Sequence, residues 1–585
     1  MASSPSGRPA WSPPAWARAA LVCAALGAWW IATFEHRRSW GWDEAMHAEL
    51  PAVRMLLTAR AGDLDGFFAV LHGCQQYPFG WPLVLAGVQG LCGVSELLAR
   101  FTGLACWAFC LWGVFLLAQE LAQGRRGEGE GPRRGDDLLP WLALAFAALS
   151  PLALGYAASL FLEVPAATAT VFALRAWLRR SARGGRSASV PRQLAAGAWL
   201  CVAFFAKWNY GLLLIGACGL DWLLGLVAAR RAGRFWRELH ALPFLALPLL
   251  LGLGWWLFLP LPYGFETGAE HRRVLFEFLG SNRQLAATPW EQRVLFWSVF
   301  LCFSARLFLV ELVGLAASLR GLLEPGTRSL WLILLAAGLP VWIHPFHLDR
   351  FLIPAAPVLW VLAAAGLAAW LPERPLARLG VLGPVAAAAL LFPAFDAPFL
   401  ARRLGLVRGD AELQQYIVDL LADKHRLGTG RPAWVPGLEP EGAAAILELV
   451  TAEVGAGERV GWIGINSELP PAAVHLALLE ASGERERFLR DAHRPMDVTF
   501  TGADPQWDVE RLREFAADYD LFISTDPPDV GGRASRAFVR GYAERLVTEL
   551  GWRPRQLGTA SLEQEGRAPR EISVYALRPP AAPGP

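Results

Sequence analysis

The chain leaves its first apolar segment through Ser39-Trp40-Gly41-Trp42-Asp43-Glu44-Ala45-Met46-His47-Ala48-Glu49. Tryptophans at this depth are common at a bilayer boundary, where their rings lie among the lipid headgroups. Two neighbouring carboxylates need a further reason, because removing charge from water near a bilayer is costly. For an isolated acidic pair, the ordinary alternative is a solvated loop. Asp43 and Glu44 are therefore candidate site residues, and the charges elsewhere in the chain bear on them.

The composition is that of a membrane protein with many spans. Of the 585 residues 54% are hydrophobic and 18% charged, and apolar runs of about twenty residues recur. Residues 1–16 are rich in Pro and Ser and are predicted to be disordered, and 19–34 lacks a signal-peptide cleavage pattern, which predicts a retained first helix. The net charge of +2 and the lack of a basic tract argue against nucleic acid as a partner. The eight cysteines show no metal-ligand spacing with histidine.

The arginine distribution predicts the topology. Apolar segments predict spans at 17–34, 79–98, 100–122, 138–156, 163–181, 193–206, 208–229, 240–260, 293–316, 329–343, 350–371 and 378–398. The arginine-rich connections all become cytoplasmic only if 79–98 does not cross. That segment begins Tyr77-Pro78-Phe79-Gly80-Trp81-Pro82 and contains Gln89, so we place it in one long outer loop, 35–99. Eleven crossings follow, or twelve if 79–98 crosses, and Arg37 and Arg38 on the outer side are the one conflict.

This topology brings a set of charged residues to the outer face: Asp43, Glu44, Arg100, Glu163, Lys207 and Arg350. The same segregation supports the topology, so the two inferences are not independent. Each lysine or arginine alone could extend to the interface, whereas a glutamate cannot reach far. Together the set offers carboxylates for acid–base work and cations for an anionic headgroup. A reaction on a lipid phosphate at a membrane surface needs this combination.

Six short blocks follow one another along the chain: Trp42-Asp43-Glu44, Tyr77-Pro78-Phe79-Gly80-Trp81, Gly93-Val94-Ser95-Glu96-Leu97-Leu98-Ala99-Arg100, Leu162-Glu163-Val164-Pro165, Ala206-Lys207-Trp208-Asn209-Tyr210-Gly211 and Asp349-Arg350-Phe351-Leu352-Ile353-Pro354. In this order they resemble the blocks of the protein O-mannosyltransferase and aminoarabinose transferase superfamily. Members of that superfamily are glycosyltransferases of the GT-C fold that use polyprenyl-phosphate sugars. The resemblance covers roughly 17–400. It departs at Glu163, where aminoarabinose-type members usually have Asp, and at Tyr77-Pro78-Phe79, which lacks the basic residue of many relatives.

The resemblance implies a mostly α polytopic GT-C domain and an inverting transfer at the outer face of a bacterial-type inner (plasma) membrane. Arg350, Lys207 and Arg100 would hold the donor phosphate, since arginine matches phosphate oxygens with a bidentate fork and lysine acts as a point charge. Asp43 would act as base on the hydroxyl of a lipid, glycan or protein acceptor, and Glu44 or Glu163 would orient the acceptor or stabilise positive charge on the sugar. Which acid is the base stays open. The sequence establishes no cofactor: three carboxylates could hold a divalent metal, but the nearby cations favour charge pairing.

Further residues are candidate substrate contacts. His47 follows Glu44 by three residues and can share its helical face, whereas Glu49 cannot in an α-helix. Tyr77 belongs to the second block. His344 and His347 flank a proline near Arg350, and Arg283 lies in the outer loop 261–292; interface packing or a solvated loop is the alternative for each.

The region 402–585 changes character, because charged residues return and apolar runs shorten. Predicted strands at 459–465, 496–500, 521–524 and 572–577 alternate with predicted helices at 410–424, 440–454, 470–482, 508–518 and 534–549. This pattern predicts a small extracytoplasmic α/β domain that binds acceptor or shapes access to the site. Gly461-Trp462-Ile463-Gly464 lacks the full glycine pattern of a nucleotide loop.

Two other classes of function remain open. A lipid-linked sugar flippase or transporter often has two related halves and broken helices at the midplane. The sequence shows no internal repeat, and its charges lie at the ends of spans. A non-catalytic glycan-binding protein on a GT-C scaffold is the third hypothesis, and the joint presence of Asp43, Glu44, Lys207 and Arg350 argues against it.

Overall fold

The computed structural model provides the structure of the chain. It describes residues 14–34, 44–74, 77–125, 135–150, 156–157, 160–181, 190–231, 233, 235–239, 247–248, 250–251, 308–343, 353–371, 380, 383, 440–455, 458–465, 473–474, 476, 509–529, 543–562 and 570–580. These residues fall into two compact units, which we describe separately. One draws on Met1–Phe34, Gln75–Trp81 and Arg100–Trp434, and the other on Glu35–Cys74, Pro82–Ala99 and Val435–Pro585.

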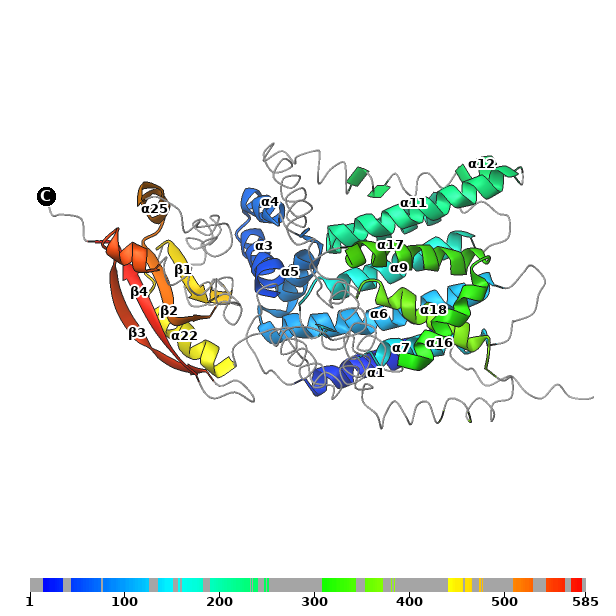
Figure 1. The fold of residues 1–585 in the computed structure, drawn as a ribbon, viewed down its shortest axis with the longest axis horizontal. Helices are drawn as coiled ribbons and strands as arrows, with labels where there is room; N and C mark the ends of the chain where they lie inside the picture. Colours follow the sequence, from blue (N-terminus) through cyan, green and yellow to red (C-terminus); the bar gives the residue numbers. More distant parts are fainter. Residues whose placement is uncertain are drawn as a thin grey trace, which may run out of the picture. The chain divides into compact units, whose positions relative to one another are not determined.

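The first unit is a bundle of apolar helices (Figure 1). It contains α1 (Ala15–Ala32), most of α6 (Glu96–Gly124), α7 (Leu139–Ala148), α9 (Glu163–Ser181), α10 (Val190–Ala206), α11 (Trp208–Arg231), α12 (Phe235–Leu239), α16 (Phe308–Ser318), η3 (Leu319–Gly321), α17 (Pro325–Ile343) and α18 (Ala356–Ala368). Among the described helices α1, α6 and α11 are long and apolar enough to cross a membrane. The chain is therefore an integral membrane protein, while the number of crossings stays a prediction because much of 240–260, 293–316 and 378–398 lies outside the described residues.

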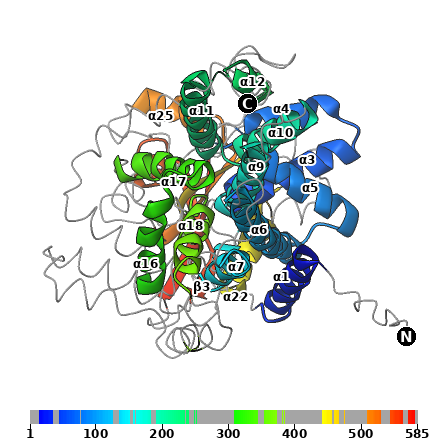
Figure 2. The ribbon, with the colours of Figure 1, turned by 90° about the vertical axis from the view of Figure 1, so that its right-hand side faces the viewer.

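Helix α18 forms the centre of one side of the bundle, between α16 and α7 (Figure 2). It is buried along its length except at Leu367, as expected for a helix that is apolar all round. The backbones of α16 and α18 approach closely, because a Cβ on Gly314 or Gly366 would collide with the main chain of the other helix. Small residues allow such contacts between membrane helices.

Polar contacts brace the end of the bundle that carries the arginine-rich connections. Arg125 Nε lies 3.1 Å from Glu324 Oε2, joining the end of α6 to the start of α17. Deeper between the helices, Asp221 of α11 accepts hydrogen bonds from Trp177 Nε1 at 2.9 Å and from Ser329 Oγ at 2.6 Å. Buried polar groups need such partners, so Asp221 ties α9, α11 and α17 together.

The short helix α5 (Gly80–Cys92) precedes α6 and is followed by Gly93, whose φ of 96° favours glycine. Its 13 residues cover about 20 Å, less than the roughly 30 Å of a bilayer's hydrocarbon core. Helix α18 is equally short although it lies in a predicted span, so the expectation that 79–98 does not cross stays a prediction. Within the second unit the outer-loop segment adds a π-turn, η1 (Ala45–Glu49), and the helices α3 (Leu50–Arg60) and α4 (Leu64–Gly73).

The C-terminal part of the second unit is a small α/β fold. Strands β1 (Val460–Ile465), β2 (Leu521–Asp529), β3 (Arg553–Leu562) and β4 (Arg570–Arg578) form one sheet in the order β1-β2-β4-β3, with α22 (Pro440–Glu453) and α25 (Val509–Ala516) beside it. The strands β1 and β2 are parallel, with Trp462 opposite Ile523, and the other pairs are antiparallel. The ring of Phe522 lies 4.9 Å from that of Trp552 in the core.

The small C-terminal sheet confirms the predicted fold class, with one correction. The strand β3 was not predicted, because Pro554, Gly558 and two arginines interrupt its apolar pattern, and pairing with β4 determines its structure. The predicted strand at 496–500 lies outside the described residues. Gly461 has a packing role, since a Cβ there would collide with the ring of Phe522.

Candidate functional site

Lys207 forms the junction between α10 and α11. It is the single non-helical residue between Ala206 and Trp208. Its N–H donates to Ala203 O at 3.1 Å, and its own carbonyl accepts from Gly211 N at 3.0 Å, so both helices continue their hydrogen bonding through it. The turn is tight, because a Cβ on Gly211 would lie 2.6 Å from Phe204 N and closer still to its Cα. Main-chain contacts therefore fix where the Lys207 side chain begins.

The ammonium of Lys207 pairs with Glu163, the first residue of α9. Lys207 Nζ donates to Glu163 Oε1 at 2.5 Å, and the two side chains are 2% and 1% exposed. Taking both charges out of water costs free energy that the attraction between them often fails to recover. A buried ion pair inside a membrane bundle is therefore typical of a functional site.

The second sequence block covers this pair. Lys207 Nζ lies 4.9 Å from the ring centroid of Tyr77 and 5.6 Å from that of Tyr210, distances at which an aromatic face attracts a cation. The Tyr77–Trp81 segment packs against the end of α10 at two residues. At Gly80 a Cβ would lie 2.5 Å from Phe205 O, and the ring centroid of Phe79 is 5.0 Å from that of Phe205. Three of the six blocks thus meet in space, although they are far apart along the chain.

The surroundings of the pair suit an anionic ligand. Helices α9 and α11 both begin here, at Glu163 and Trp208, and helix N-termini carry partial positive charge. The tyrosines bring hydroxyl groups that can donate to and accept from a sugar.

The outer-loop acids lie in the second unit. Glu44 is fully buried and stands directly before the π-turn η1, in which Leu50 N–H donates to Ala45 O. Single π-turns are frequent at functional sites. Glu49, at the end of the turn, is 2% exposed and accepts from Gln89 Nε2 at 2.7 Å (Oε1) and 2.8 Å (Oε2). His47 is half-buried in the same turn.

The remaining predicted residues divide into two groups. Arg100 lies in the second turn of α6 and is 2% exposed. Five candidates lie outside the described residues, namely Asp43, Arg283, His344, His347 and Arg350. Within the described ranges, no group of three His, Cys, Asp or Glu residues could hold a metal ion.

Sequence reasoning missed Tyr210 and the contact between Glu49 and Gln89. The signal for Gln89 was available, since a lone amide in an apolar helix needs a buried partner. The π-turn removed the signal for Glu49, because our expectation for that residue assumed α-helical spacing. Tyr210 stands three residues after Lys207, but only the tight turn brings its ring beside the ammonium.

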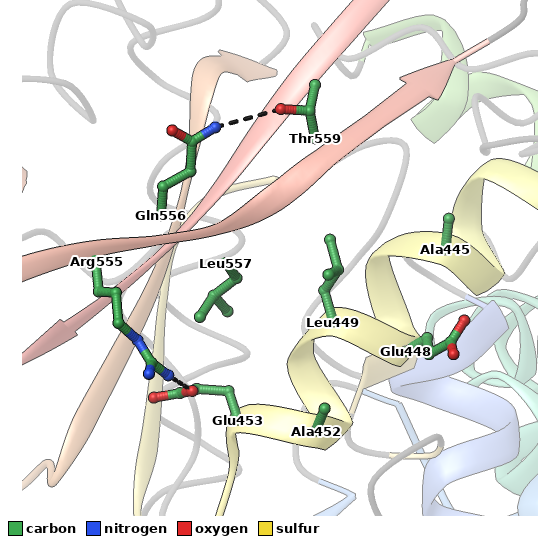
Figure 3. Close-up of a pocket in the computed structure, with 9 residues that line it drawn as sticks. All are labelled: Ala445, Glu448, Leu449, Ala452, Glu453, Arg555, Gln556, Leu557 and Thr559. Atoms are coloured by element: carbon green, nitrogen blue, oxygen red, sulfur yellow. Dashed lines mark hydrogen bonds and ion pairs between the residues drawn. The ribbon is translucent and has the colours of Figure 1, made fainter.

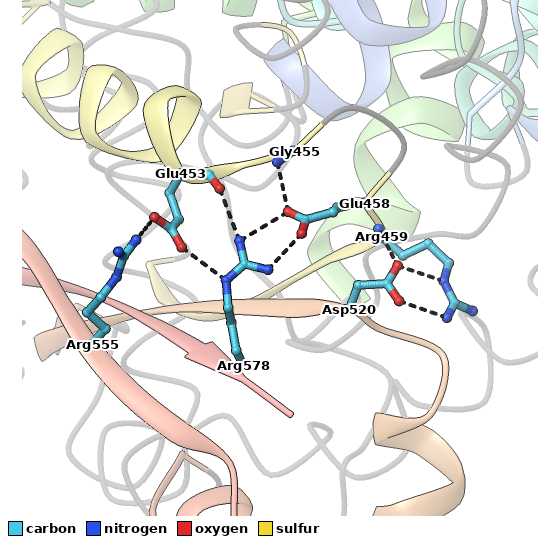
Figure 4. Close-up of polar contacts among 7 residues, drawn as sticks. All are labelled: Glu453, Gly455, Glu458, Arg459, Asp520, Arg555 and Arg578. Carbon is cyan, nitrogen blue, oxygen red and sulfur yellow. Dashed lines mark hydrogen bonds and ion pairs between the residues drawn. The ribbon is translucent and has the colours of Figure 1, made fainter. Parts of the chain in front are cut away.

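The C-terminal part carries a groove of about 610 Å³ between α22 and β3 (Figure 3). Leu449 and Leu557 point into it, while the charged Glu453 on its rim pairs with Arg555. Glu453 also accepts a hydrogen bond from Arg578 Nε at 3.1 Å, and Arg578 donates in turn to Glu458 (Figure 4). These charges are engaged with one another, so the groove is a weaker candidate for acid–base chemistry than the Glu163–Lys207 site.

Hydrogen bonds lower the pKa values of two carboxylates in this part of the chain, Asp520 and Glu458. The pKa of Asp520 is lowered, first by hydrogen bonds from the Arg459 side chain, at 3.2 Å from Nε and 3.3 Å from Nη2. Partial burial opposes a low pKa at Glu458, yet hydrogen bonds from Arg578 and Gly455 N–H outweigh it and lower the pKa. Both carboxylates therefore stabilise the domain in their ionised form.

Two crystal structures of one protein share the fold over 96% of this chain. The crystal structure of ArnT from Cupriavidus metallidurans bound to undecaprenyl phosphate aligns with a TM-score of 0.53 at 17% identity, over 96% of this chain and 98% of that one. Its apo structure aligns with the same score and identity, over 96% and 97%. The oligosaccharyltransferase of Archaeoglobus fulgidus, in complex with Zn and sulfate, reaches only 0.44 at 13% identity, over 86% and 67%. No family model and no curated protein matches the sequence. The chain has the GT-C fold, as the six blocks predicted.

Proposed function

We propose that the protein is an inverting membrane glycosyltransferase. It moves a sugar from a polyprenyl-phosphate donor to a hydroxyl acceptor at the extracytoplasmic face. The buried pair of Glu163 and Lys207, under Tyr77 and at the start of two helices, is the observation that carries this proposal. The shared fold with ArnT, which is bound to undecaprenyl phosphate in its crystal structure, supports the donor class.

The donor phosphate lies against Lys207 and Arg350 in this proposal. Glu163 holds the Lys207 ammonium in place, since their 2.5 Å hydrogen bond leaves the lysine little freedom. A phosphate whose charge is compensated is a competent leaving group. Lys207 and Arg350 therefore stabilise the negative charge that develops as the bond to the sugar breaks.

The outer-loop acids act on the acceptor. Asp43 takes the proton of the acceptor hydroxyl, and the oxygen attacks the anomeric carbon from the face opposite the phosphate. The new bond from carbon to acceptor oxygen forms as the bond to the phosphate oxygen breaks. Polyprenyl phosphate leaves with the bonding electrons, and the anomeric configuration inverts. The adjacent, buried Glu44 orients the acceptor.

The test measures transfer of radiolabelled sugar from a panel of polyprenyl-phosphate donors in membranes that contain the protein. Wild type should transfer label to an acceptor, and Asp43→Asn should lower the rate by at least about a hundredfold. Asp63→Asn is the matched control, because Asp63 caps α4 through Gly66 N–H at 2.8 Å and asparagine can cap equally well.

The other hypotheses predict different results. Unconsumed donor on the opposite leaflet, with Asp43→Asn harmless, would establish a flippase and refute the transferase. Tight donor binding with no turnover of any donor would indicate a non-catalytic sugar-lipid binding protein.

A further inference from the structure

The π-turn changes which acidic residues share a face. Residues five apart align along a π-helix, whereas residues three or four apart align in an α-helix. The turn Ala45–Glu49 therefore places Glu49 on the face of Glu44, which stands five residues earlier. Both side chains are buried, at 0% and 2% exposure.

Proline explains why the wide turn ends where it does. Pro51 stands at the start of α3 and has no N–H to donate to the preceding turn. Leu50 N–H donates five residues back, to Ala45 O. The main chain supports the turn through this hydrogen bond, and a side-chain contact adds to that support.

Gln89 of α5 supplies that contact. Its Nε2 lies 2.7 and 2.8 Å from the two oxygens of Glu49, so one amide group engages the whole carboxylate. The same two helical segments meet again nearby, where Arg60 Nη2 lies 3.5 Å from Gly90 O and a Cβ on Gly90 would lie 3.3 Å from Leu56 Cδ1. The helix that leaves the acidic stretch is therefore fixed on α5.

We infer that Glu49 and Gln89 are positioning residues, whose contact holds the π-turn and thereby fixes Glu44, which orients the acceptor. This inference rests on the proposed function. Neither residue touches the reacting atoms in this account. They act through the turn, because a displacement of about 1 Å at a catalytic group can cost about a hundredfold in rate.

An exchange of the two side chains tests the inference in the full-length protein. Gln89→Glu places two carboxylates together and should lower kcat tenfold or more, while the donor KM changes less than threefold. The double variant Glu49→Gln with Gln89→Glu restores one carboxylate and one amide and should recover kcat to within threefold of wild type. Gly87→Ala, on the same helix with nothing near its Cβ, is the matched control. An unchanged kcat in Gln89→Glu, or no recovery in the double variant, would overturn the inference.

Hydrogen exchange separates this inference from the proposed function, since it needs no turnover. Amide exchange in residues 44–50 should accelerate in Gln89→Glu and return to the wild-type rate in the double variant. Unchanged exchange refutes the contact as the support of the turn. A wild type without transfer activity refutes the proposed function, and the exchange data then still decide whether Gln89 holds the turn.

Discussion

Replacing Gly211 by alanine tests whether the tight turn at Lys207 sets the geometry of the site. The new Cβ would lie 2.6 Å from Phe204 N, whereas ordinary van der Waals contact begins at 3.4 Å. Since the obstructing atoms belong to the main chain, the start of α11 must move away from the end of α10 by about 1 Å. Lys207 lies between these two helices and moves with them.

The expected loss of stability in Gly211→Ala is the difference between two opposing contributions. Overpacking at a close contact costs about 1–3 kcal/mol, and the higher helix propensity of alanine recovers about 1 kcal/mol. Stability should thus fall by at most about 2 kcal/mol, which leaves the protein folded. A shift of about 1 Å in the Lys207 ammonium should lower kcat by about a hundredfold.

The assay compares Gly211→Ala with Gly216→Ala, the same substitution five residues later in α11. Nothing lies within 4 Å of a Cβ on Gly216, so this variant should keep the wild-type kcat and be at least as stable as wild type. Both are measured by sugar transfer from the polyprenyl-phosphate donor and by thermal unfolding in detergent. Equal activity of the two variants would refute the claim that the turn positions Lys207.

Three further predictions concern charged groups. Removing both partners of the buried pair, with Glu163→Gln and Lys207→Met, should cost no more transfer activity than Lys207→Met alone, because the two residues act as a unit; additive losses in a double-mutant cycle would contradict this. Asp221→Ala should lower the free energy of unfolding by about 2 kcal/mol, since two buried donors lose their acceptor, while kcat per folded molecule stays at the wild-type value. The lowered pKa values of Asp520 and Glu458 mean that their ionised forms stabilise the C-terminal domain at neutral pH and that this contribution is lost as pH falls. The difference in unfolding temperature between wild type and Asp520→Asn should therefore be largest near pH 7 and shrink below about pH 4.

The helices of the candidate site could be predicted from the sequence, because apolar spans with charged ends are a local signal. The segments predicted at 193–206 and 208–229 correspond to α10 and α11, and Lys207 stands between them. The order of the six blocks predicted the GT-C fold. Local patterns suffice when each element is long, apolar and clearly bounded.

Contacts between distant residues could not be predicted in the same way. Glu163 and Lys207 are 44 residues apart, and no periodicity states that their side chains meet. The position of Tyr77 over Lys207 depends on Gly80 fitting against a carbonyl oxygen, a steric fact of the folded chain. The expectation that Glu49 lies away from the face of Glu44 assumed α-helical spacing, whereas residues 45–49 form a π-turn with a different number of residues per turn.

The strand β3 shows the same limit in the C-terminal part. Residues Arg553 to Gln556 are exposed, so this strand lacks the alternation of buried and solvated positions that marks a half-buried strand. Its hydrogen bonds to β4 impose the extended backbone instead, with Thr559 opposite Ser573.

The close approach at Gly80 and Gly211 has a consequence for how such a scaffold diversifies. Main-chain atoms approach closely at these glycines, so the main chain that carries Lys207 is placed by contacts that do not involve Tyr77 or Tyr210. Exchange of Tyr77 or Tyr210 for residues of other shape would then leave the main chain of Lys207 in place. Under the proposed function, the main chain that places the phosphate-binding lysine can stay the same during evolution while the side chains that contact the sugar change.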